Sequence, residues 1–388
     1  MSIFESLSSR AKQAPESGIV EVINHGWGKD GLIPLWAGEG DRPTPEFIIQ
    51  AGADALLAGE TFYTLQRGIP ELRQGLADYY QRQFDVSLPM SAFTVTGSGM
   101  QAIKLAIEAV SGPGDEIVYM SPAWPNLPAA CGVAGGTPVP VPMNVDEGRW
   151  SLDLNRFEAA ISPKTRALFI NSPSNPTGWT ATRDELIALR DMARKHGLWI
   201  IADEIYAKFF YGAQRAPSFL DVVEPDERIL FVNSFSKNWA MTGWRVGWIV
   251  APPEMGQVLE NLVQYSTSGV AQFMQKGAAR AVADGDAFID DQVARAHTAR
   301  DLLCKTLLAT GRVDVVPPAG AFYAFFRIDG VNDTRRAALD IVDKANVGLA
   351  AGTAFGPGGE MYMRACFLRR LDQIEDAAGR LAQYIKAL

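Results

Sequence analysis

The feature that most constrains the fold is an alternation of short apolar runs with helical segments between residues 93 and 250. The runs are rich in β-branched and aromatic residues and almost continuously apolar, which is typical of strands buried on both faces. Helical segments, notably 100–110 and 183–195, separate several of them. This alternation predicts a three-layer α/β domain with a mostly parallel sheet. The predicted strands are residues 93–96, 117–120, 139–141, 167–170, 198–202, 229–232 and 246–250.

The chain of 388 residues is long enough for two core-forming units. We expect the large α/β domain to span residues 41–280. Beyond it, strands and helices alternate less strictly, which favours a smaller α+β domain over residues 281–388. Predicted strands in this part include residues 347–350 and 361–367. Residues 1–40 are predicted to form an amino-terminal arm and part of the small domain.

Composition argues against several classes of function. The net charge of −8 is wrong for a nucleic-acid-binding surface, which needs clustered lysine and arginine. The three cysteines and three histidines lie without metal-ligand spacing, so no metal site is predicted. The chain has no run of 18 apolar residues and no apolar leader at its amino end. We therefore expect a cytoplasmic protein that binds neither membranes nor nucleic acids.

Lys237 follows the apolar run 229–232 after a few turn-forming residues, so it is predicted to lie where the carboxyl end of a strand opens into a loop. Ligands of parallel α/β sheets usually bind at that edge. A lysine there is either an ordinary solvated amine or a partly buried amine with a lowered pKa that condenses with a carbonyl. Ser234 and Arg245 offer a hydroxyl and a planar cation suited to a phosphate, which favours the second interpretation.

Polar residues also follow the predicted strand 93–96. A turn containing Ser98 and Gly99 opens a helix at Met100, and the first N–H groups of such a helix form a site for anions. Alone this is a weak signal, because glycine turns often precede helices.

Two further strand ends carry polar side chains. Asn175 lies in a turn with two X-Pro bonds, which is predicted to contain a cis-proline. This asparagine is either an Asx-turn residue or a donor to an oxygen of a bound ring. Asp203 directly follows a buried strand, where a carboxylate is unfavourable unless it is paired, for example with a protonated ring nitrogen. With Tyr206 added as a donor to a phenolic oxygen, these groups together predict a site for pyridoxal 5′-phosphate.

Over essentially its whole length the chain resembles the fold-type-I, class I/II pyridoxal-phosphate-dependent aminotransferases of the aspartate aminotransferase family. The spacing of the lysine motif and its trailing arginine from NPTG and DEIY is highly specific. The motifs that carry the resemblance are LWAGEGD, YTLQRGIPELR, NSPSNPTG, ADEIY, SFSKNWAMTGWRVGW and MYMRACF.

The resemblance implies a role for each candidate residue. Lys237 would bind the cofactor aldehyde, Asp203 would bind the pyridine nitrogen, and Asn175 and Tyr206 would bind the phenolic oxygen. Trp124 would stack on the cofactor ring. The residues expected around the phosphate are Ser98, Gly99, Met100, Ser234 and Arg245, together with Tyr63 from a neighbouring subunit.

The resemblance also places the substrate. Arg364, which lies inside an apolar run, would bind the substrate α-carboxylate, and Gly38, Trp124 and Asn175 would contact the substrate as well. The family implies a homodimer with shared active sites, whose small-molecule partners are an amino acid and a 2-oxo acid.

The implied activity is transfer of an amino group from an L-amino acid to a 2-oxo acid by a ping-pong mechanism, with Lys237, Asp203 and Tyr206 as catalytic residues. An alternative on the same scaffold is a pyridoxal-phosphate-dependent C–S β-lyase or a related eliminating enzyme. A ligand-sensing regulator is disfavoured, because the first forty or so residues contain no recognisable DNA-binding segment.

The substrate side chain is less constrained. In some relatives a lysine at the position of Met100 helps to recruit a distal carboxylate, and methionine here argues against strict aspartate specificity. Tryptophans in or near the expected site segments favour neutral or apolar substrates; these are Trp27, Trp36 and Trp239.

Overall fold

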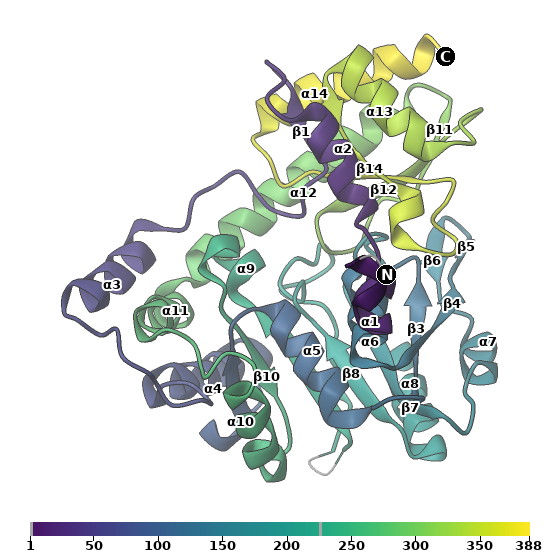
Figure 1. Cartoon of the computed structure of the whole chain (residues 1–388). Helices are drawn as coiled ribbons and strands as arrows, with labels where there is room; N and C mark the ends of the chain where they lie inside the picture. The colour runs from purple at the N-terminus through teal and green to yellow at the C-terminus, as the bar shows by residue number, and fades with distance from the viewer. Residues whose placement is uncertain (1–2, 225–226) are drawn as a thin grey trace.

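The computed structural model describes residues 3–224 and 227–388, so the first two residues of the predicted arm lie outside the described residues (Figure 1). Its largest element is a seven-stranded sheet with, in spatial order, β2 (Phe93–Thr96), β10 (Gly247–Val250), β9 (Ile229–Ser234), β8 (Trp199–Asp203), β7 (Thr165–Asn171), β3 (Glu116–Ser121) and β4 (Thr137–Pro142). β10 runs antiparallel to both its neighbours, and the other pairs are parallel. The prediction of a mostly parallel α/β sheet is confirmed.

The side chains of this sheet alternate between two apolar cores. On β3, Val118 and Met120 belong to one core, whereas Ile117 and Tyr119 belong to the other. The strands are apolar along their whole length because both faces are buried. The helices that contribute to the first core include α4 (Pro70–Phe84), α8 (Arg183–His196) and α11 (Gln272–Asp284). Those that contribute to the second are α5 (Gly99–Val110), α6 (Asn126–Ala134) and α10 (Gly256–Gln264).

A four-stranded antiparallel sheet forms a second unit, drawn above the large sheet in Figure 1. Its order is β11 (Val313–Val315), β12 (Tyr323–Ile328), β15 (Met363–Cys366) and β14 (Ala350–Ala351). The helices α12 (Asp286–Leu308), α13 (Thr334–Ala345) and α14 (Leu371–Lys386) share a third core with it. Figure 1 shows α2 (Gly18–Gly26) beside α13, and the two helices are in contact. Val22, Leu35 and Trp36 from the amino-terminal segment are part of this third core.

The predicted strand at 347–350 is divided between two sheets. β13 (Val347–Gly348) pairs in parallel with β1 (Ile33–Pro34), whereas β14 pairs with β15. Gly348 lies so close to the Trp36 indole that a Cβ at this position would stand 2.0 Å from the ring. The passage of the chain from one sheet to the other therefore requires a glycine here. The other elements are α1 (Ser9–Gln13), α3 (Glu46–Leu57), β5 (Asn144–Asp146), β6 (Arg149–Ser151), α7 (Leu154–Ala159) and α9 (Phe235–Asn238).

The register of the large sheet brings polar strand ends together. Asn171 at the end of β7 pairs with Asp203 at the end of β8, and β9 ends nearby at Ser234. In the described part of the chain, no helix combines the length and the apolar character needed to cross a membrane.

Two neighbouring leucines near the end of α12 test how much the core of the small unit contributes to stability. Leu307 is fully buried and Leu308 is 46% exposed. We expect Leu307→Ala to lower the free energy of unfolding by about 3 kcal/mol, because it removes buried methyl groups and leaves a cavity. Leu308→Ala should change it by less than about 1 kcal/mol. Urea unfolding followed by circular dichroism measures both, and equal losses would contradict the assignment of this core.

Candidate active site

A hollow of about 480 Å³ lies at the polar edge of the large sheet and is lined by residues of both sheets and of the amino-terminal segment. It collects most of the predicted site residues, although they are distant in sequence. The predicted residues that line it are Gly38, Gly99, Met100, Trp124, Asn175, Asp203, Tyr206, Ser234, Lys237, Arg245 and Arg364.

Lys237 lies in α9, a single helical turn that starts directly after β9, rather than in the predicted loop. The turn forms because the Ser234 hydroxyl caps it by accepting from the Ser236 N–H. The Lys237 amine donates to the Gly38 carbonyl oxygen at 2.7 Å. Burial lowers the pKa of Lys237 to about 8. The uncharged form, which attacks a carbonyl, is therefore much more populated near neutral pH than for an ordinary lysine.

Asp203 ends β8 and is buried. Within residues 3–224 and 227–388, the Ile205 N–H is the one hydrogen-bond donor to its carboxylate, at 3.3 Å. Burial raises the pKa of Asp203 to about 7, against the smaller opposing effects of that hydrogen bond and of Lys237. A ligand cation placed against this carboxylate would hold it in the ionised form.

The start of α5 forms a concave backbone surface beside β9. Gly99 and Met100 line the hollow, and the Ser98 hydroxyl accepts from the Gln101 N–H at 3.0 Å as the helix cap. A Cβ on Gly247 would come within 2.6 Å of the Ser98 carbonyl carbon, so a glycine in β10 is what lets this turn approach the sheet. The helix start offers N–H groups and a positive dipole end to an anion.

Arg245 stands beside this surface. Its guanidinium donates to the Thr242 carbonyl oxygen at 2.5 Å, and no acidic side chain within the described ranges pairs with it. Its charge is therefore available to an anion bound at the start of α5.

Arg364 comes from β15 and is only 2% exposed. It donates to the Asn175 side-chain oxygen at 3.0 Å and to the Trp36 carbonyl oxygen. Its Nε is buried and has no partner in the described structure. A buried guanidinium held only by neutral acceptors favours a bound carboxylate, which matches its planar geometry.

Asn175 and Tyr206 both line the hollow. Asn175 belongs to the predicted turn, in which both X-Pro bonds are cis, and its N–H donates to Asn171 Oδ1 at 2.9 Å. Tyr206 is buried and its hydroxyl lies 2.8 Å from that of Tyr323. Burial raises the pKa of Tyr206 well above its ordinary value, so it remains a protonated donor at neutral pH.

Two predicted residues do not line the hollow within one chain. Ser98 lies behind it as the α5 cap, and Tyr63 is 90% exposed. Of the three tryptophans taken as a sign of neutral or apolar substrates, two do not line the hollow of this chain. Trp27 is 81% exposed, and Trp239 is fully buried among Tyr79 and Phe235. Trp36, the third, does line the hollow.

Several lining residues escaped the sequence analysis. Tyr323 lies inside an apolar run typical of a core strand, so its hydroxyl gave no signal. Ile19 and Ile23 line the hollow from α2, and their spacing of four residues was the one available indication, in a stretch that otherwise looks polar.

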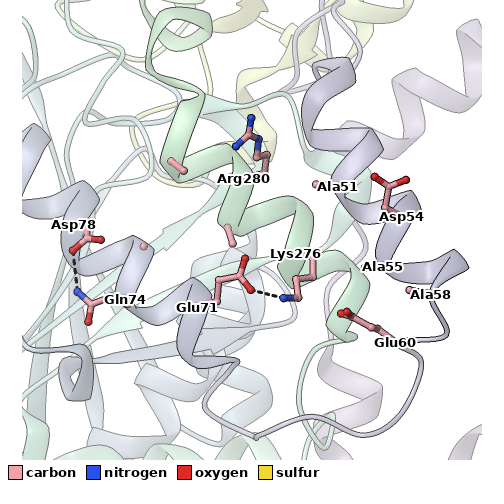
Figure 2. Close-up of a pocket in the computed structure, with 13 residues that line it drawn as sticks. Ala51, Asp54, Ala55, Ala58, Glu60, Glu71, Gln74, Asp78, Lys276 and Arg280 are labelled. Atoms are coloured by element: carbon pink, nitrogen blue, oxygen red, sulfur yellow. Dashed lines mark hydrogen bonds and ion pairs between the residues drawn. The ribbon is translucent and has the colours of Figure 1, made fainter.

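A second hollow, of about 620 Å³, lies between α3, α4 and α11 (Figure 2). Small residues such as Ala51, Ala55 and Gly75 contribute much of its wall. Its two cations are neutralised locally, because Lys276 pairs with Glu71 and Arg280 pairs with Asp284. The predicted residues Lys237, Asp203 and Arg364 line the first hollow and not this one.

The chain matches the family model for aminotransferase class I and II over residues 30–381. It is 32% identical to the aromatic-amino-acid aminotransferase 2 of Thermococcus litoralis, over 98% of each chain. It is 34% identical to the probable aspartate/prephenate aminotransferase of Thermus aquaticus, over 99% of this chain and 100% of the relative.

Solved structures agree with these matches. Thermus thermophilus aspartate aminotransferase with maleate superimposes with a TM-score of 0.90 at 32% identity, covering 97% of this chain and 99% of that one. Pyrococcus furiosus alanine aminotransferase gives 0.92 at 26% identity, covering 98% and 100%.

Replacing Asp203 tests whether its carboxylate is desolvated in the ligand-free protein. Its pKa is about 7 in the folded chain against an ordinary 3.8, so the native state binds a proton more tightly than the unfolded state. The contribution of Asp203 to the stability of the wild type should therefore fall as the pH rises from about 4 to 7. The free energy of unfolding of Asp203→Asn, taken relative to that of the wild type, should rise by on the order of 3 kcal/mol between pH 4 and pH 8. Urea midpoints at both pH values measure this, and a pH-independent difference would refute it.

Proposed function

The chain belongs to the aminotransferase class I and II family and is an aminotransferase, and from this premise we propose that it uses pyridoxal 5′-phosphate to move an amino group from an L-amino acid to a 2-oxo acid in a ping-pong cycle. The observation that carries the proposal is the convergence of Lys237, Asp203 and Arg364 on one hollow. The relatives reported above are named as aminotransferases, so the eliminating enzyme is not favoured.

The residues of the hollow fit this cofactor. Lys237 supplies an amine with a lowered pKa for the aldehyde. Asp203 supplies a carboxylate for the protonated pyridine nitrogen, and no cation among the described residues forms an ion pair with it. The start of α5, Ser234 and Arg245 would hold the phosphate. Trp124 would stack on the ring.

The proposed donors to the phenolic oxygen follow from the hydrogen bonds. Since the Asn175 side-chain oxygen accepts from Arg364, its amide nitrogen is left to donate to the cofactor, beside the Tyr206 hydroxyl. When bound, pyridoxal phosphate supplies a conjugated ring that withdraws electrons from the substrate Cα.

Residues of the chain would position the substrate and remove the proton from its Cα. Arg364 binds the α-carboxylate and so fixes Cα in reach of Lys237. The Lys237 Nζ would take the proton from the substrate Cα as the general base, and its pKa of about 8 suits this task. Asp203 would hold the protonated pyridine nitrogen and stabilise its positive charge.

We propose neutral or apolar amino acids as preferred substrates. Apolar side chains that line the hollow include Ile19, Ile23, Trp36 and Met100. The lysine and arginines that line it in the described chain are Lys237, Arg245 and Arg364, and the cofactor and the α-carboxylate would occupy all three.

We further propose a homodimer with shared sites and a cytoplasmic location. Phe62, Tyr63 and Leu65 are exposed along one loop, which a second copy of the chain would cover while Tyr63 reaches the partner's phosphate. All three cysteines are buried and free, as a reducing compartment permits. The same proposal divides the chain into a large domain at 41–280 and a small domain at 281–388 completed by residues 1–40.

Borohydride reduction after incubation with pyridoxal phosphate tests the central assignment. We expect the label on Lys237 by peptide mapping, and Lys237→Ala should lose both the label and at least about a thousandfold in transamination rate. Lys208→Met is the matched control, because Lys208 is also buried but donates to Gln83 elsewhere. Full transamination by Lys237→Ala would overturn the proposal.

A panel of amino donors tests the substrate class. Leucine and phenylalanine should give a higher kcat/KM than aspartate with 2-oxoglutarate as acceptor. Met100→Lys should raise the value for aspartate about tenfold, because it adds a cation beside the hollow, whereas Met100→Leu should keep the wild-type preference. A wild type that strongly prefers aspartate would contradict the proposed class, and release of pyruvate and thiol from cystathionine without an acceptor would support an eliminating enzyme.

A further inference from the structure

Tyr323 contacts two functional side chains at once. It is the first residue of β12 and is fully buried. Its hydroxyl lies 2.8 Å from the Tyr206 hydroxyl, and the Arg364 guanidinium carbon lies 4.6 Å from the centre of its ring. It reaches this place because residue 38 is a glycine, since a Cβ there would stand 2.6 Å from the phenol oxygen.

Both hydroxyls of the Tyr206–Tyr323 pair are protonated at neutral pH. Burial raises the pKa of both tyrosines above the ordinary value, so each phenol keeps one proton at neutral pH. One hydroxyl must donate to the other. With the Tyr206 O–H donating a hydrogen bond to the cofactor's phenolic oxygen, the Tyr206 oxygen could only accept from Tyr323, so Tyr323 would be the donor of the pair. Donors in series polarise one another, which makes Tyr206 a stronger donor.

The ring of Tyr323 acts on the other side of the site. A cation over an aromatic face is stabilised by the electron density of the ring, more so where water is excluded. The Tyr323 ring thus packs against the face of the Arg364 guanidinium. The Asn175 side-chain oxygen and the Trp36 carbonyl oxygen accept hydrogen bonds from its N–H groups.

We propose that Tyr323 is a positioning residue of this active site, whose hydroxyl strengthens the Tyr206 donation to the cofactor and whose ring holds Arg364 for the substrate carboxylate. This inference rests on the proposed function. It assigns the two effects to different parts of one side chain, so they can be separated by substitution.

Tyr323→Phe removes the hydroxyl and keeps the ring. Donors to the phenolic oxygen stabilise its negative charge, and a weaker Tyr206 donation makes that oxygen more basic. The midpoint of the pH-dependent absorbance change of the bound cofactor should therefore rise by roughly half a pH unit, while KM for the amino donor stays unchanged. Tyr323→Leu removes the ring as well, and should also raise KM about tenfold.

A double variant tests whether the hydroxyl acts through Tyr206. Tyr206→Phe should itself raise the midpoint, and adding Tyr323→Phe should then produce no further rise. Tyr211→Phe is the matched control, because Tyr211 also lies under an arginine, Arg300 at 4.5 Å, and donates to a backbone carbonyl at 2.6 Å outside the hollow. It should change neither the midpoint nor KM.

An unchanged midpoint in Tyr323→Phe, or a further rise in the double variant, would overturn the inference. A wild type without any cofactor absorbance would instead refute the proposed function, so the two failures are distinguishable. Should Tyr323→Phe not fold, as judged by thermal unfolding, Gly38→Ala tests the same contact. Its methyl group displaces the phenol, and it should raise the midpoint in the same direction; no rise there would equally overturn the inference.

Discussion

The structure depends on the desolvation of ionisable groups at one edge of the large sheet. Removing a charge from water costs several kcal/mol unless partners replace the solvent. Burial moves the pKa of Asp203 up to about 7 and that of Lys237 down to about 8, so both groups titrate near neutral pH in the ligand-free chain. In the described structure the hydrogen-bond acceptors of Arg364 are neutral, the Asn175 side-chain oxygen and the Trp36 carbonyl oxygen. A ligand with an aldehyde, a ring cation and anionic groups would offset these costs together, which is why the three side chains are best explained as one site.

The position of Arg364 also explains how the two sheets are joined. Its guanidinium belongs to the small sheet, Asn175 follows a strand of the large sheet, and Trp36 comes from the amino-terminal segment. The Tyr206–Tyr323 pair makes a second link between the same sheets. The parts of the hollow proposed to bind the substrate and the cofactor are therefore built on different units that meet through buried polar contacts. A shift of one unit against the other would alter both parts of the site.

Much of the large sheet was predictable because its strands have a local signal. Residues 117–120 are apolar at every position, and the two core clusters show the reason: alternate side chains enter different cores. The segment at 347–350 had the same signal and was predicted as one strand, yet the chain changes sheets at Leu349. That change depends on the Trp36 ring against Gly348, a contact between residues more than 300 positions apart, which no local pattern contains.

The amino-acid sequence by itself determined the family, the strands of the large sheet, and the chemical groups at Lys237, Asp203 and Arg364, because motifs and hydrophobic periodicity are local properties of the chain. Only the tertiary structure decided which other side chains reach these groups. Tyr323 and Ile23 look like ordinary core residues in the sequence, and Trp239 looks like a site residue, yet the first two line the hollow and the third is packed in a core. The physical reason is that the direction of a buried side chain is set by packing between distant elements, which periodicity along one element does not encode.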